Sequence, residues 1–210
     1  NINGSFDMNG MTFTTLCINE EVTINGNENT ISNLTLKAPV VNGNIIGHNG
    51  GAGGAAFVNV ATGSKVTVKD LTFSGATAID QEDTDNAKAA IVADNVEGVL
   101  ILDNVHVTNS TVKGIYAMGG LVNDVQCNNL NGTSGDVTIT NCSVTKTTFS
   151  NIEVANESGC IGSIIGRVAG GHTTIDKTKA EDNVIEAYVC RGNQERTVGD
   201  YVGNYVGQVS

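Results

Sequence analysis

The sequence predicts an all-β fold, a parallel β-helix (solenoid) of about five stacked coils with three short strands each. Three observations predict it. Apolar and polar residues alternate at two-residue spacing, as on a half-buried strand. The alternating segments recur about every 36 residues. Only 4% of the residues are aromatic, so the core consists of small and β-branched side chains, which suit thin layers of strands.

The first strand of each coil contains a break in the alternation. Val68 and Leu71 are three residues apart, so a straight strand would turn Leu71 toward solvent. A corner at Asp70 restores the inward phase, and Asn and Asp tolerate the left-handed backbone that such a corner needs. Five segments share this pattern, at 28–36, 65–73, 99–107, 136–144 and 172–180. The predicted corner ladder consists of Asn33, Asp70, Asn104, Asn141 and Lys177.

A second motif, two small residues followed by two apolar ones, predicts another strand in each coil. Its copies are AAFV (55–58), AAIV (89–92), GGLV (119–122), GSII (162–165) and GNYV (203–206). A weaker apolar segment between the two motifs, such as 76–79, gives the third strand. The register stacks Leu34, Leu71, Val105, Cys142 and Thr178 above one another, so we expect Cys142 to lie in the core.

A helical fold and a β-sandwich are the alternatives. No 11-residue window has the apolar stripe of an amphipathic helix, and Gly and Asn interrupt the chain every few residues. Short strands at regular spacing also suit a sandwich, but a sandwich does not need a repeated corner. The corner ladder therefore favours the solenoid.

The acidic composition excludes two classes of partner. The chain has 22 Asp and Glu against 11 Lys and Arg, a formal charge of -11, which repels phosphate backbones and anionic lipid. It contains no run of 18 apolar residues, so we expect no nucleic-acid partner and no membrane insertion. The five cysteines include no CxxC pair, which disfavours a zinc site, and their odd number cannot close a fully paired disulfide framework.

We expect residues 1–210 to form a single β-helix domain, with 1–21 as an N-terminal cap and 22–210 as the coils. Solenoid ends need caps because a bare coil presents unpaired strand edges. The chain opens on Asn1 without Met and shows no capping element after YVGNYVGQVS, so we expect a fragment of a longer protein with further domains of the same chain.

The sequence offers few residues for chemistry. Arg167 follows the GSIIG strand, where an exposed side chain would meet an acidic sugar, although a solvated turn residue is the simpler interpretation. His106 points outward between two valines; it is a second candidate for ligand binding, although a surface histidine is the simpler interpretation. An acidic loop offers oxygen ligands for Ca²⁺ but lacks the Gly and the distal Glu of an EF-hand, so a solvated charge cluster is the simpler interpretation. Its residues are Asp80, Glu82, Asp83 and Asp85. We predict no catalytic residue and no cofactor other than this candidate Ca²⁺.

Two stretches resemble known families. The stretch VTINGNENTISNLTL (22–36) resembles the first coil of right-handed parallel β-helices, and GGLV after ITNCSV resembles the GLUG repeat of bacterial cell-surface proteins. GSIIG and YVGNYVG are near matches, whereas AAFV and AAIV replace Gly by Ala. The resemblance covers about residues 22–209. It implies a right-handed β-helix in an adhesin-like, secreted or cell-surface protein, and it carries over no catalytic residue.

The leading functional prediction is a non-catalytic surface module whose stacked coils present one face to a glycan or a host protein. The regular repeat without a convergent polar constellation favours it. The alternative is a carbohydrate-active β-helix, such as a polysaccharide lyase or glycoside hydrolase, or a glycan-binding domain; Arg167 and the acidic loop motivate it. Ice binding would require a flat, regular Thr ladder, and the outward positions Thr67, Ile101, Thr138 and Thr174 are too irregular.

Overall fold

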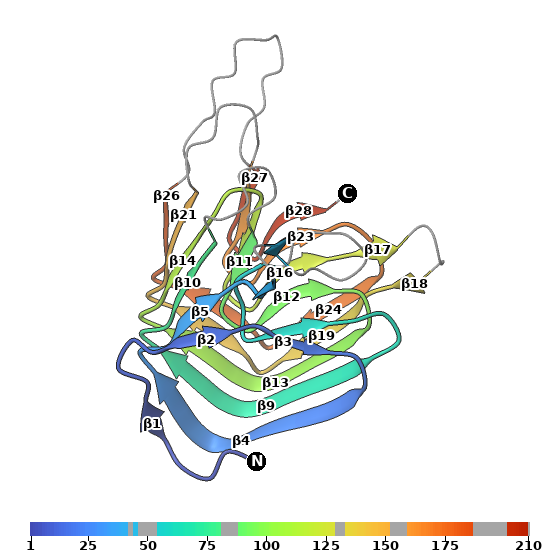
Figure 1. The fold of residues 1–210 in the computed structure, drawn as a ribbon. Helices are drawn as coiled ribbons and strands as arrows, with labels where there is room; N and C mark the ends of the chain where they lie inside the picture. The colour runs from blue at the N-terminus through green and yellow to red at the C-terminus, as the bar shows by residue number, and fades with distance from the viewer. Residues whose placement is uncertain are drawn as a thin grey trace.

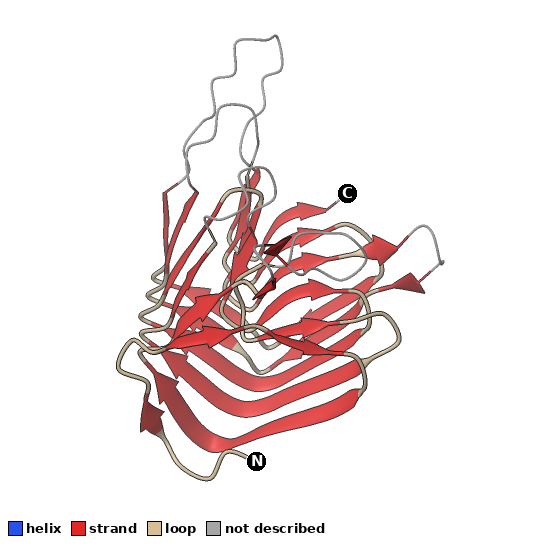
Figure 2. Cartoon of the chain, in the orientation of Figure 1, coloured by secondary structure: helices blue, strands red, loops and turns tan. Residues whose placement is uncertain are grey.

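The chain folds as a parallel β-helix, which confirms the predicted fold class (Figures 1 and 2). The computed structural model describes residues 1–41, 44–45, 54–80, 88–128, 133–151, 159–186 and 201–209. Every regular element in these ranges is a strand, so none of them is a helix that would cross a membrane. Four sheets of parallel strands, here called sheets 1 to 4, wind around one apolar core.

Sheets 1 and 2 contain the predicted corner strands and the segments that follow them. Sheet 1 consists of β1 (Phe6–Asp7), β4 (Glu21–Ser32), β9 (Lys65–Ser74), β13 (Val99–Thr108), β19 (Asp136–Thr140), β20 (Ser143–Thr145), β24 (His172–Asp176) and β25 (Lys179–Glu181). Sheet 2 consists of β2 (Thr12–Thr14), β5 (Thr35–Lys37), β10 (Thr77–Ile79), β14 (Thr111–Gly114), β21 (Thr148–Asn151) and β26 (Val184–Glu186).

Sheets 3 and 4 contain the strands on either side of a tight bend. Sheet 3 consists of β11 (Lys88–Ala90), β15 (Ala117–Gly119), β22 (Cys160–Gly162) and β27 (Tyr201–Gly203). Sheet 4 consists of β3 (Leu16–Ile18), β8 (Val58–Val60), β12 (Ala93–Val96), β16 (Val122–Val125), β23 (Ile165–Val168) and β28 (Val206–Val209). Two antiparallel pairs, β6 (Val40–Val41) with β7 (Asn44–Ile45) and β17 (Cys127–Asn128) with β18 (Thr133–Ser134), lie outside these sheets.

A coil such as β13 to β16 contains four strands rather than the expected three. The difference lies in the small-small-apolar-apolar motif, which spans a bend between two strands instead of forming one strand. In the GGLV copy, β15 ends at Gly119 and β16 begins at Val122. A Cβ at Gly119 would overlap the carbonyl oxygen of Val122, so the bend requires a residue without a side chain here. Ala90 pairs with Gly119, so the aligned copy is 90–93 and not AAIV at 89–92.

The left-handed corner within sheet 1 lies at four of the five expected residues. The φ angles are 52° at Asp70, 56° at Asn104, 56° at Asn141 and 47° at Lys177. The core residues that follow the corner are buried, with Leu71 at 1% exposure, Val105 at 0% and Cys142 at 2%. The prediction that Cys142 lies in the core is confirmed.

Asn33 belongs to a different corner, and its expected alignment is wrong. It has φ 54°, but it stands with Gly75, Asn109, Lys146 and Asp182 at the corner between sheets 1 and 2. In β4, Asn25 pairs with Lys69 and Asn29 with Leu71, so residues 26–28 replace the single residue Asp70. Leu34 consequently does not stack on Leu71. The apolar spacing alone did not reveal these two inserted residues.

Residues near the N-terminus continue the stack. Phe6 pairs with Ile31 in sheet 1, and Thr12 pairs with Thr35 in sheet 2. Leu16 pairs with Val58 in sheet 4. These short strands therefore cover the edges of β4, β5 and β8.

Candidate functional site

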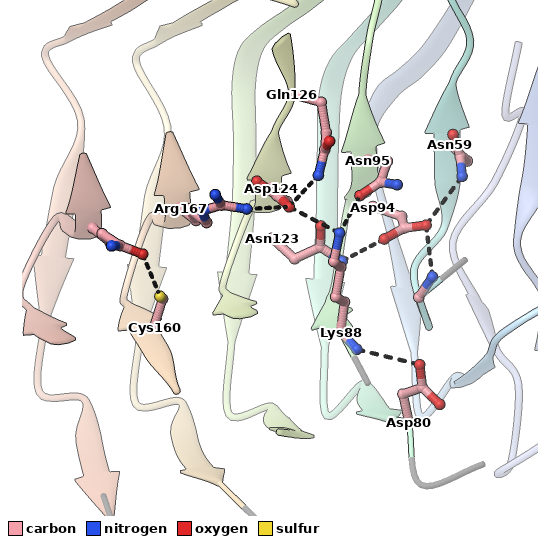
Figure 3. A network of polar contacts seen from close by, with 12 residues as sticks. Asn59, Asp80, Lys88, Asp94, Asn95, Asn123, Asp124, Gln126, Cys160 and Arg167 are labelled. Carbon is pink, nitrogen blue, oxygen red and sulfur yellow. Dashed lines mark hydrogen bonds and ion pairs between the residues drawn. The ribbon is translucent and has the colours of Figure 1, made fainter. Parts of the chain in front are cut away.

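Sheet 4 carries a row of polar side chains where it meets sheet 3, and those on β8, β12 and β16 are buried; Figure 3 shows the row across successive strands. Asn95, Asp124, Arg167 and Gln208 pair in register on β12, β16, β23 and β28. We call the whole set the polar ladder. It comprises Asn59, Lys88, Asp94, Asn95, Asn123, Asp124, Arg167 and Gln208.

The strand sequence explains why polar residues gather here. Two neighbouring strands of sheet 4, β12 and β16, have two apolar residues in the core, three positions apart, with two polar residues between them. In β16 these are Val122 and Val125 around Asn123 and Asp124. In β12, Ala93 and Val96 flank Asp94 and Asn95 in the same way. The polar pairs are nevertheless buried, because the neighbouring arm of the bend lies against them.

Lys88 reaches this row from sheet 3. Its Nζ atom lies 2.8 Å from Oδ2 of Asp124 and donates to Oδ1 of Asn95 at 3.0 Å. The Lys88 side chain is 7% exposed and that of Asp124 is 0% exposed. The centroid of the Tyr116 ring lies 5.5 Å from Nζ, within the range of a cation–π contact. The site thus holds a buried amine between a carboxylate and a carboxamide.

Asp94 forms the second centre of the ladder. Its Oδ2 accepts from the backbone N–H of Gly54 at 2.7 Å and from Nδ2 of Asn59 at 3.0 Å. Its Oδ1 accepts from Nδ2 of Asn123. Burial raises the pKa of the Asp94 carboxyl, and the nearby positive charge of Lys88 and these hydrogen bonds oppose that rise.

Arg167 and Gln126 complete the surroundings of Asp124. The guanidinium Nη1 of Arg167 lies 3.6 Å from Oδ2 of Asp124, and Nε2 of Gln126 donates to the same oxygen. Arg167 also lies over the ring of Tyr116, 5.3 Å from its centroid. Burial raises the pKa of the Tyr116 hydroxyl. Within the described ranges, Oδ1 of Asp124 is buried without a hydrogen-bond partner.

Arg167 does not lie in a turn. It is a residue of β23, its side chain is 21% exposed, and its guanidinium pairs with Asp124, so the expectation of a solvated turn residue is wrong. The pattern placed it next to a bend, but the bend precedes β23 and the arginine lies within the strand. Its predicted role in binding a ligand stays a prediction.

His106 lies on the outer face of sheet 1, apart from the polar ladder. Its ring nitrogens hydrogen-bond Oγ of Ser143 at 2.8 Å and Oδ1 of Asn104 at 2.9 Å. Burial lowers the pKa of the half-buried imidazole. Both nitrogens thus have protein partners, and ligand binding at His106 stays a prediction.

The candidate Ca²⁺ loop falls mostly outside the described residues, because Glu82, Asp83 and Asp85 lie there. Asp80 is described and is 2% exposed, and its Oδ2 accepts from the backbone N–H of Lys88 at 3.3 Å. Among the described residues, no three His, Cys, Asp or Glu side chains gather as a metal site would require. The Ca²⁺ prediction stays untested.

Sequence reasoning missed Lys88, Asp94 and Asp124. A signal was present, because the polar pairs 94–95 and 123–124 follow the bend at the same place in successive coils. The motif around the bend was interpreted as a single strand, which hid the two arms that bring these residues together.

No model of a known protein family matches the chain, and neither the curated proteins nor the solved structures contain a match.

Proposed function

We propose that the chain is a non-catalytic surface module that presents one face of the β-helix to a glycan. The observation that carries this proposal is a column of threonines on sheet 2, which pair in register on five neighbouring strands. The column consists of Thr12, Thr35, Thr77, Thr111 and Thr148.

The hydroxyls of this column suit a polyhydroxylated ligand. Thr12 is exposed and the other four residues are partly exposed, so the column borders solvent. Neighbouring strands lie about 4.8 Å apart, which gives a regular row of groups that both donate and accept hydrogen bonds. Across the corner, sheet 1 adds Ser32, Ser74, Thr108 and Thr145 in register.

The charge of the whole chain also favours a neutral or basic glycan over an acidic one. The formal charge of the chain is -11, which repels polyanions. We place the module on a cell surface or among secreted proteins, as a stalk or adhesin-like segment of a bacterial protein, in keeping with the GLUG-like motifs. Further domains of the same chain and a host protein are partners in the same proposal.

Two alternatives are less well supported. A carbohydrate-active enzyme would rest on Arg167, which pairs with Asp124, and on an acidic loop mostly outside the described residues. Ice binding would need a flat face with more than one Thr column. Two residues along the strands of sheet 2 stand Lys37, Ile79, Lys113 and Ser150, so the second column is mixed.

The test is binding of the purified chain to an array of neutral, basic and acidic glycans. We expect the double variant Thr77→Val and Thr111→Val to lose binding at least tenfold, because valine keeps the shape and removes the hydroxyls. The matched control is Thr23→Val with Thr67→Val, an in-register pair on sheet 1, which should bind normally. Equal binding by the two double variants, or no binding to any glycan, would reject the proposal.

A further inference from the structure

Three groups that can form an amide bond meet in the polar ladder. The Lys88 amine lies 3.0 Å from the carboxamide oxygen of Asn95 and 2.8 Å from a carboxylate oxygen of Asp124 (Figure 3). Lys88 belongs to β11 and Asn95 to β12, on the two arms of one bend. Asn95 and Asp124 are register partners on neighbouring strands. The amine thus lies between an electrophile and a proton acceptor.

The surroundings of the Lys88 amine favour its reaction with Asn95, because they keep the amine away from solvent. Taken as whole residues, Asn95 is 2% exposed, Lys88 6% and Asp124 0%, so bulk water does not compete for the amine. The Tyr116 ring borders Nζ at 5.5 Å. Holding the reacting groups in contact replaces an encounter between separate molecules and lowers the barrier to their reaction.

Asp124 is placed to move the protons. Its Oδ2 contacts Lys88 Nζ directly, and its Oδ1 is buried without a hydrogen-bond partner in the described part of the chain. The Oδ1 atom can therefore carry a proton without displacing an existing donor. Proton transfer by a group in contact with the reacting atom is general acid–base catalysis.

We propose that Lys88 and Asn95 form an intramolecular amide bond with Asp124 as the catalytic residue. The Lys88 ammonium gives one proton to Asp124, and the neutral Nζ attacks Cγ of Asn95. The new Nζ–Cγ bond forms, the Cγ–Nδ2 bond breaks, and the departing nitrogen takes up protons from Nζ and Asp124. The net change converts an ammonium group and a carboxamide into a secondary amide and one ammonium ion. Asp124 ends ionised, and no oxidant or co-reactant is needed.

The reaction can occur in only one of these three coils, because the neighbouring coils have no lysine at the position of Lys88. The positions in register with Lys88 on β15 and β22 are Ala117 and Cys160, which have no amine. The product would tie β11 to β12 across the bend between sheets 3 and 4. This crosslink is independent of the glycan-binding proposal, because it lies at a different face and needs no ligand.

The experiment is the intact mass of the purified wild-type chain, measured after denaturation. We expect a mass lower than that of the sequence by one ammonia molecule. Digestion should leave the bond after Lys88 uncut, and fragmentation should place a branch between residues 88 and 95. A mass equal to that of the sequence, in protein kept folded for days, would overturn the proposal without any variant.

Variants separate this bond from other losses of ammonia, such as cyclisation at another asparagine. Lys88→Arg, Asn95→Ala and Asp124→Asn should each show the full sequence mass. Asn59→Ala is the matched control, because Asn59 belongs to the ladder and contacts Asp94 rather than Lys88. It should keep the loss of ammonia. A loss that persists in Lys88→Arg would assign the ammonia to another residue and overturn the proposal.

Discussion

The Nζ atom of Lys88 lies 2.8 Å from Oδ2 of Asp124, although the two residues are 36 positions apart and belong to different sheets. The contact joins one coil to the next and crosses the bend between sheets 3 and 4. Because both side chains are buried, the pair restricts the packing of the coils more than a surface ion pair would.

Removing the lysine should therefore destabilise the fold. In an Asn95→Ala background, where the proposed amide bond cannot form, we expect Lys88→Met to lower the free energy of unfolding by about 3 kcal/mol, the lower end for breaking a buried pair, because Arg167 and Gln126 still contact Asp124. In the same background, Lys88→Met with Asp124→Leu should recover part of the loss, since it removes both charges of the pair and leaves only the partly exposed Arg167 without its carboxylate. Urea unfolding measures both. Equal losses in the single and double variants would contradict this account.

The corner ladder gives a second prediction. Asn104 has φ 56°, and its Nδ2 donates to Oδ1 of Asp70 at 3.0 Å on the preceding coil. We expect Asn104→Ala to lower the free energy of unfolding by about 1–2 kcal/mol, because alanine is strained in the left-handed region. Asn104→Gly removes the same hydrogen bond without that strain. The difference between the two variants in the free energy of unfolding, measured in urea, therefore gives the cost of the left-handed backbone at alanine. A glycine variant as unstable as the alanine variant would assign the effect to the side chain.

The corners show what a single sequence can predict. At Asp70, Asn104 and Asn141, the alternation of apolar and polar residues breaks once. A residue with a left-handed backbone at that point returns the following apolar side chains to the core. At Asn33 the same pattern misled, because the two inserted residues before Asn29 shift the register without changing the apolar spacing. The apolar periodicity within one segment predicts that a corner exists. The hydrogen-bonded pairing between strands of neighbouring coils determines with which residues of the other coils that corner aligns.

The polar ladder shows what a single sequence does not predict. Lys88 precedes two alanines and looks like a solvated residue, and Asp124 looks like a strand-end residue. They become neighbours only because β15 and β16 fold back on each other at Gly119, and because coils stack in a fixed register. Contacts between residues about one coil apart depend on both conditions, and neither is visible in the composition.

Burial also controls the reactivity of the cysteines. Cys142 is 2% exposed, and burial raises the pKa of its thiol to about 11, which leaves little thiolate at neutral pH. Cys17 is exposed, although partial burial raises the pKa of its thiol as well. We expect an alkylating reagent to label Cys17 in the folded chain and Cys142 only after denaturation, as read by peptide mass spectrometry. Labelling of both at the same rate would contradict the core position of Cys142.

Asp94 gives a prediction for the pH dependence of stability. Burial raises the pKa of its carboxyl above the ordinary value of 3.8, so the folded chain binds this proton more tightly than the unfolded chain. The resulting stabilisation is fully present below the unfolded pKa and is lost as the pH rises through the folded pKa. Other carboxylates titrate as well, so the comparison is with Asp94→Asn. We expect the wild-type free energy of unfolding, minus that of the variant, to increase as the pH falls from neutral into the acid range. Urea unfolding over that range measures the difference. A difference that stays constant or decreases on acidification would show that the hydrogen bonds from Gly54, Asn59 and Asn123, together with Lys88, outweigh the cost of burial.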